Sequence, residues 1–173
     1  GTRNPRQTGG HLGAGGAGRF LLAAGQRLVD RIQSVSHCTS EEAWRTVAPH
    51  LHGFDRDPLP IAWLKGRLDA LTGNDPHAAS GIRVTDALAD HALPDVTADV
   101  ILGNPPFGTP LRNGTNAEQV RRRAANVLQQ PLGPYADIAA VFLLLSDSAL
   151  RANGRLSMVQ PMSVLAARDT GSI

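Results

Sequence analysis

The chain has 173 residues, of which 42% are hydrophobic and 18% are charged, and its formal net charge is +2. This length suffices for one domain with a full core, and the composition is ordinary for a globular protein. No apolar run reaches the roughly 18 residues that a membrane-spanning helix needs. The single cysteine, Cys38, excludes a disulfide framework and a cysteine-rich zinc site. We therefore expect a cytoplasmic protein without a membrane partner.

The N-terminal third contains a glycine-rich stretch followed by a helical pattern. Residues 1–13 are polar and without periodicity, which indicates a loose or non-native tail. The stretch GAGGAG at 13–18 then leads into residues 19–33, where Leu21, Ala24, Leu28 and Ile32 recur at helical spacing. We expect a glycine-rich turn that opens a helix, and an irregular segment or short second helix at 34–45.

Short strands then alternate with helices. Asp57 is placed to cap a helix that begins at Pro58, where proline is tolerated. The other expected elements are strands at 50–54, 82–88, 98–103 and 155–161, a polar loop at 108–134, and a helix at 135–152 that ends at Asn153-Gly154. This alternation predicts an α/β fold with a Rossmann-like, doubly wound and mostly parallel sheet.

Three candidate binding positions fall where ligands bind in such sheets, beyond the carboxyl ends of the strands. Gly16 and Gly18 would let a ligand approach the backbone closely, although such a stretch is also typical of a flexible loop. Asp55 could accept hydrogen bonds from ribose hydroxyls, because Asp57 already fills the helix-cap role. Asp86 could accept one from an adenine amino group, or serve as a turn residue. These positions suggest a pocket for an adenosine-containing ligand.

The stretch ADVILGNPPFG at 98–108 ends a predicted strand in a stiff corner. Two prolines fix the backbone after Asn104, so its side chain and the Pro105 carbonyl form two rigid acceptors. Phe107, after Pro106, offers a flat face for a planar ring. This corner therefore suits a flat ring that carries an amino group. The alternative is a plain proline-rich turn with a core phenylalanine.

The residues quoted above resemble the amino-methyltransferases that use S-adenosyl-L-methionine, and most of all the DNA adenine-N6 methyltransferases of restriction-modification type. The resemblance implies that cofactor binding falls to Ala14, Gly16, Gly18, Asp55 and Asp86. It implies that the catalytic corner is made by Asn104, Pro105, Pro106 and Phe107. In it, Asn104 and the Pro105 carbonyl would hold the amino group, while Phe107 would stack on the flipped base.

The resemblance also implies direct methyl transfer to the N6 atom of an adenine that leaves the DNA stack. Positioning and electrostatics would supply most of the rate, and no metal would be needed. The expected partners are double-stranded DNA and a specificity or nuclease subunit or domain. The arginines at 112 and 121–123 could contact phosphates, or form a solvated charged face.

The chain departs from the family pattern at one point before the glycines. Leu12 and Gly13 stand where an acidic residue and often a proline are usual. We expect residues 14–173 to be a partial catalytic domain, with a sheet incomplete at both ends and no target-recognition domain. We further expect this piece alone to be a poor enzyme.

Other functions remain open on the sequence. The same corner occurs in methyltransferases of RNA bases and of protein glutamine. A non-catalytic remnant that serves as a DNA-binding or assembly module is a further alternative, which the residue at position 12 favours. A dehydrogenase is disfavoured, because no complete dinucleotide-binding glycine pattern follows a strand.

Overall fold

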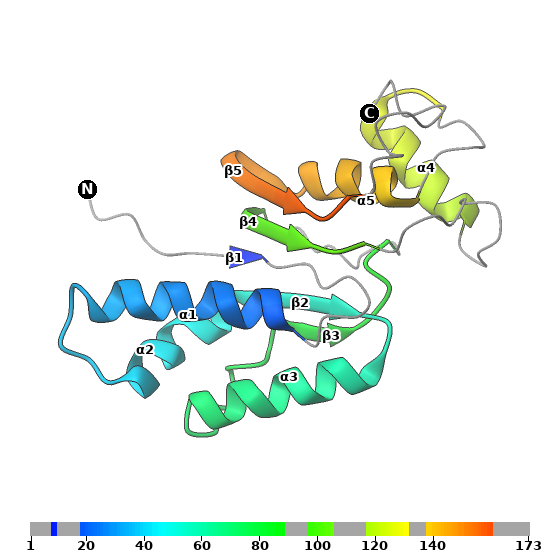
Figure 1. Ribbon diagram of the computed structural model, residues 1–173. Helices are drawn as coiled ribbons and strands as arrows, with labels where there is room; N and C mark the ends of the chain where they lie inside the picture. The colour runs from blue at the N-terminus through cyan, green and yellow to red at the C-terminus, as the bar shows by residue number, and fades with distance from the viewer. Residues whose placement is uncertain (1–7, 10–17, 89–96, 106–116, 132–137, 161–173) are drawn as a thin grey trace.

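The strands pair in parallel throughout the described part of the chain. The computed structural model describes residues 8–9, 18–88, 97–105, 117–131 and 138–160 (Figure 1). One sheet has the order β1 (Thr8–Gly9), β2 (Leu51–Asp55) and β3 (Ile82–Val84), and a second pairs β4 (Ala98–Gly103) with β5 (Leu150–Met158). The helices are α1 (Arg19–Gln33), α2 (Ser40–Val47), the 3-10 helix η1 (Ala48–His50), α3 (Pro58–Leu71), α4 (Ala117–Leu128) and α5 (Ile138–Asp147).

The register of the pairs brings the strand ends together. Asp55 at the end of β2 pairs with Val84 at the end of β3, and Gly103 at the end of β4 pairs with Met158 at the end of β5. β1 lies beside both β2 and β4, and the arrows of β2 to β5 point the same way in Figure 1. The carboxyl ends of the strands therefore share one edge of the molecule.

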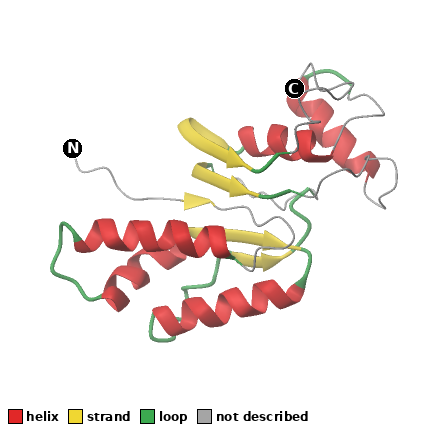
Figure 2. Cartoon of the chain, in the orientation of Figure 1, coloured by secondary structure: helices red, strands yellow, loops and turns green. Residues whose placement is uncertain are grey.

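Helices cover both faces of β2. Leu51 packs in a cluster with residues of α1, α2 and α3, whereas Phe54 packs in another with residues of α4 and α5. Side chains three residues apart in a strand point to opposite faces. In Figure 2 the strands accordingly lie between the first three helices and the last two. The α/β class is confirmed, but the doubly wound order stays a prediction, because no ladder joins the two sheets within the described residues.

The first three helices form where local chemistry favours them. α1 spans the range that its periodicity predicts. α2 begins at a capping box, in which the Thr39 hydroxyl accepts from the Glu42 N–H and the Glu42 carboxylate accepts from the Thr39 N–H. Asp57 caps α3 as predicted, since its carboxylate accepts from the Leu59 N–H at 2.9 Å.

Two predictions about the second half of the chain were wrong. The expected polar loop at 108–134 contains α4, whose Ala117, Val120 and Ala124 are buried at helical spacing. The helix expected to reach residue 152 ends at Asp147, and Asn153-Gly154 lie inside β5 instead of closing that helix. There Asn153 has a φ of 69°, and the β4–β5 register shifts between Ala98 and Val100.

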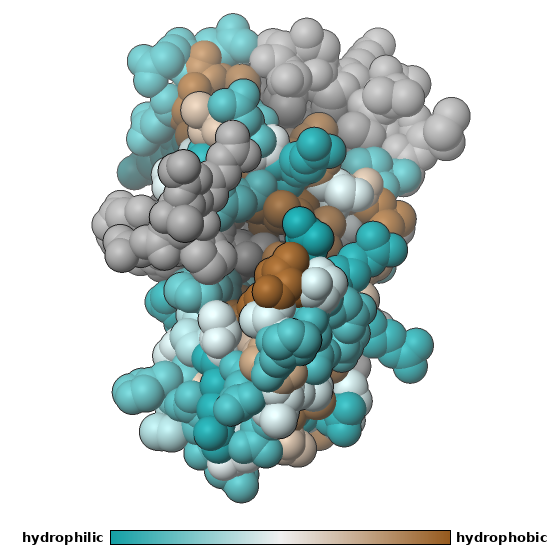
Figure 3. Space-filling view, turned by 90° about the vertical axis from the view of Figure 1, so that its left-hand side faces the viewer, coloured by the Kyte–Doolittle hydropathy of each residue, from teal (hydrophilic) through white to brown (hydrophobic). Residues whose placement is uncertain are grey.

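The N-terminal end of the strands forms a different surface from their carboxyl ends. It faces the viewer in Figure 3, where hydrophilic side chains cover most of the lower half and apolar ones show near the middle.

No helix within the described ranges has the length and apolar character to cross a membrane. The proposed division into a tail at 1–13 and a partial catalytic domain stays a prediction, although Thr8–Gly9 pair with β2.

Two helical glycines differ in what surrounds them, and this predicts opposite effects of alanine. A Cβ at Gly25 would lie 2.7 Å from ring atoms of buried Trp44, whereas one at Gly66 would meet nothing within 4 Å. Gly25→Ala should destabilise the fold by about 1–2 kcal/mol, because overpacking exceeds the gain in helix propensity. Gly66→Ala should stabilise it by about 0.5–1 kcal/mol. Urea unfolding of both variants measures this, and equal effects would contradict the packing.

His52 on β2 predicts a loss of stability in mild acid. Burial and the neighbouring Arg83 lower its pKa, and its Nδ1 atom is buried without a partner in the described residues. The unfolded chain takes up a proton first as pH falls, so the free energy of unfolding should decrease below the ordinary histidine pKa. His52→Gln should flatten that decrease in unfolding curves measured between pH 8 and pH 5. Parallel pH profiles for both proteins would contradict this.

Candidate functional site

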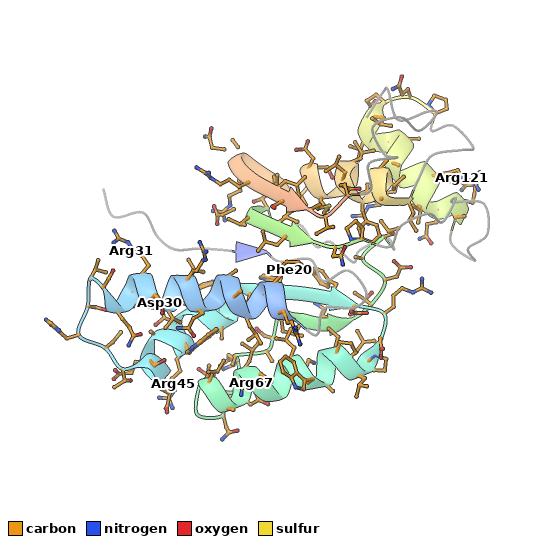
Figure 4. All side chains as sticks on the ribbon, viewed as in Figure 1. Phe20, Asp30, Arg31, Arg45, Arg67 and Arg121 are labelled. Atoms are coloured by element: carbon orange, nitrogen blue, oxygen red, sulfur yellow. The ribbon has the colours of Figure 1, made fainter. Side chains whose placement is uncertain are left out.

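The carboxyl edge of the strands gathers four of the predicted site residues. Asp55 is the last residue of β2, Asp86 follows β3, and Asn104 and Pro105 follow β4 directly. Gly18 precedes α1 at the end of that helix nearest to this edge, where Figure 4 labels Phe20. Ala14, Gly16, Pro106 and Phe107 lie outside the described residues. The structure thus places polar side chains from three strands where ligands of parallel sheets bind.

Asp55 is held at the end of β2 by the turn that follows. Its side chain accepts a hydrogen bond from the Asp57 N–H at 3.0 Å, and its backbone carbonyl accepts one from the Thr85 N–H at 2.8 Å. The residue is only 5% exposed. The sequence suggested that the Asp55 carboxylate has no structural role. In the structure one of its oxygens orders the turn, so that role is shared. No residue in the described ranges donates to the other oxygen, so one acceptor remains for a ligand.

Asp86 is fixed in a similar way at the end of β3. Its Oδ1 atom accepts from the Leu88 N–H at 2.9 Å, and its Oδ2 atom lies 4.0 Å from Nε of Arg56. The Arg56 side chain is 80% exposed, so this ion pair is weak. The structure is therefore compatible with both interpretations of Asp86, as a turn residue and as a ligand contact. One oxygen accepts from the turn, and the other is available to a ligand that displaces Arg56.

Asn104 carries an acceptor that nothing in the described part of the protein satisfies. Its Oδ1 atom is buried without a hydrogen-bond partner, and Pro105 next to it is buried. Leaving a buried acceptor unpaired costs about 1–3 kcal/mol. A ligand with an N–H donor would remove that cost. The orphaned oxygen therefore fits the amine-binding role that the sequence assigns to this corner.

Gly18 has a structural reason to be glycine. Its φ is +70°, and an added Cβ would lie 2.7 Å from a methyl carbon of Leu64 on α3. Glycine adopts this left-handed conformation without steric cost and lets α1 approach α3 closely. Gly18 also caps α1 without a side-chain hydrogen bond. The described contacts thus explain this glycine by packing, and its contact with a cofactor stays a prediction.

The arginines at 121–123 lie on α4 rather than in a loop. Arg122 pairs with Glu118 at 3.2 Å, and Nε of Arg121 donates to the Ala117 carbonyl at 3.4 Å. Arg123 donates to the Leu88 carbonyl and so ties α4 to the loop after β3. Figure 4 places Arg121 far from the α1–α2 end of the molecule. Arg112 lies outside the described residues.

Gln160 is a further candidate residue at this edge, which the sequence analysis did not single out. It follows β5 closely at the same edge, and its Nε2 atom donates to the Ala139 carbonyl at 3.3 Å. Its Oε1 atom is buried without a partner in the described residues. The sequence offered only a weak signal, a polar residue before a proline at a strand end. No group of three or more potential metal ligands occurs in the described ranges.

Comparison with known proteins shows the family of the chain that carries this edge. A family model described as N-6 DNA methylase matches residues 14–172, which is most of the chain. The match includes every predicted site residue from Ala14 to Phe107. A search of curated proteins found no match.

Proposed function

The chain belongs to the N-6 DNA methylase family, and from that premise we propose that it transfers a methyl group from S-adenosyl-L-methionine to the N6 atom of an adenine in double-stranded DNA. The observation that carries the proposal is the orphaned Oδ1 atom of Asn104, at the end of β4. A family of DNA methylases needs an acceptor for an amino group there, and the buried amide oxygen supplies one.

The target end of the site would act by orienting the amino group. An exocyclic amine is a poor nucleophile, because its lone pair is delocalised into the ring. Asn104 and the Pro105 carbonyl would accept hydrogen bonds from its two N–H groups, which favours a tetrahedral nitrogen and frees the lone pair. The base would have to leave the DNA stack, at a cost of a few kcal/mol. Phe107 would stack on it.

The cofactor end of the site would act by holding an adenosine group. When bound, S-adenosyl-L-methionine supplies an electrophilic methyl group on a sulfonium. The unoccupied oxygen of Asp55 would accept from ribose hydroxyls, and that of Asp86 from the adenine amino group, once Arg56 moves aside. Backbone at Ala14, Gly16 and Gly18 would hold the amino-acid part. The two ends lie at one edge of the molecule, as in-line transfer requires.

Contacts to the DNA backbone would come from α4. Arg122 and its partner Glu118 are 78% and 69% exposed, so their ion pair contributes little and gives way easily to a phosphate. A guanidinium group fits phosphate geometry well. Binding through such contacts would weaken as the salt concentration rises.

Substitutions at Asp55 and at the neighbouring Asp57 distinguish a cofactor-binding role of Asp55 from a structural role. Asp55→Asn keeps an acceptor for the Asp57 N–H but removes the charge, and we expect it to weaken S-adenosylhomocysteine binding about tenfold or more. Asp57→Asn is the matched control, because asparagine caps a helix as well as aspartate does. Its affinity should stay within about twofold of wild type. Calorimetric titration of the three proteins measures this.

Two outcomes of that titration would contradict the proposal. Equal affinity of wild type and Asp55→Asn would remove the ribose role from Asp55. Equal weakening by both variants would mean that the general negative charge of this turn, rather than one carboxylate, attracts the ligand. Unfolding curves measured alongside exclude loss of the fold as the cause.

A further inference from the structure

The ends of β4 and β5 are held side by side. Gly103 pairs with Met158, and the Val159 N–H donates to the Gly103 carbonyl at 3.0 Å. Neighbouring strands lie about 4.8 Å apart. The same register sets Asn104 level with Val159, so Gln160 leaves the adjacent strand one residue later, and Figure 1 shows the two arrowheads together.

Gln160 is anchored in a way that fixes which end of its amide is unpaired. Its Nε2 atom donates to the Ala139 carbonyl in the first turn of α5, and it also approaches the Met158 sulfur at 3.9 Å. The nitrogen is thus turned toward α5 and Met158. The Oε1 atom is left without a donor in the described residues, as is Oδ1 of Asn104.

Two unpaired amide oxygens at adjacent strand ends need a reason. Each is shielded from solvent and has no partner in the described residues, and an unpaired buried acceptor costs about 1–3 kcal/mol. Anchoring the end of β5 to α5 requires only the nitrogen of Gln160. A methionine would fill a similar volume without the cost of the buried oxygen. The oxygen is therefore best explained by a donor that arrives with a ligand.

We propose that Gln160 is a target-contacting residue, whose Oε1 atom accepts a hydrogen bond from the amino group of the base that Asn104 holds. The inference rests on the proposed function, which supplies an adenine amino group at this corner. A hydrogen of that group can be shared between two acceptors, so Gln160 adds to Asn104 and Pro105 rather than replacing either.

Two substitutions separate this contact from the structural anchor. Gln160→Met removes both the acceptor and the anchoring nitrogen, whereas Gln160→Glu keeps acceptor oxygens, loses the anchoring N–H and adds a negative charge. A purely structural role predicts the same effect of both variants. A target contact predicts that only the methionine variant loses recognition of an amino group. Gln130→Met, in the exposed turn after α4, is the matched control.

The test compares two labelled, short, single-stranded oligonucleotides in the presence of saturating S-adenosylhomocysteine. One carries adenine at every position, and the other carries purine, which lacks the 6-amino group. We expect the wild-type chain to bind the adenine strand about tenfold more tightly by fluorescence anisotropy. Gln160→Met should reduce that preference to about twofold or less, while Gln160→Glu and Gln130→Met should keep it.

The proposal is overturned if Gln160→Met keeps the full preference, or if both Gln160 variants lose it equally. It is also overturned if the wild type shows no preference, because no amino group is then recognised. S-adenosylhomocysteine affinity and methyl transfer are measured separately on the same proteins. Their absence beside an intact adenine preference would count against the proposed transfer and not against Gln160.

Discussion

Parallel pairing of the strands is the constraint on which the site depends. The β2–β3 register sets Asp55 beside Val84, so Asp86, two residues after Val84, follows at the same edge of the sheet. The β4–β5 register pairs Gly103 with Met158, so Asn104 and Gln160 leave adjacent strands at that edge as well. A parallel sheet needs helical crossovers, and these bury both of its faces, which leaves the carboxyl edge as the place where polar side chains meet a ligand. The chemistry of the site therefore follows from the hydrogen bonds of the strands.

The site combines ordered carboxylates with unpaired amide oxygens. Asp55 and Asp86 each spend one oxygen on a backbone N–H of the following turn, which fixes where the other oxygen lies. Asn104 and Gln160 instead leave buried oxygens without a partner in the described residues. The first arrangement preorganises acceptors for hydroxyl or amino donors. The unpaired amide oxygens destabilise the free protein, and a bound amine would remove that destabilisation. Both arrangements therefore favour a ligand rich in N–H and O–H donors.

Local sequence patterns predicted the strand ends and the helix cap at this edge. The features that depend on tertiary contacts were not predicted. Asp57 was placed as a helix cap from the proline that follows it, and the strand before Asn104 was predicted with the observed bounds. α4 was missed because its charged residues hid a short apolar spacing, and Gln160 because its importance lies in a contact with α5. The turn bond of Asp55 is likewise invisible without coordinates. Family membership came from the match over residues 14–172.

The identity of the methylated atom tests the central claim most directly. The chain would be incubated with methyl-labelled S-adenosyl-L-methionine and unmethylated DNA, RNA or protein, and each acceptor digested and analysed by mass spectrometry. The account predicts labelled N6-methyladenine from DNA, and none when Asn104 is replaced by alanine. Label on RNA, on glutamine or on cytosine, or label on adenine that persists without the Asn104 amide, would contradict it.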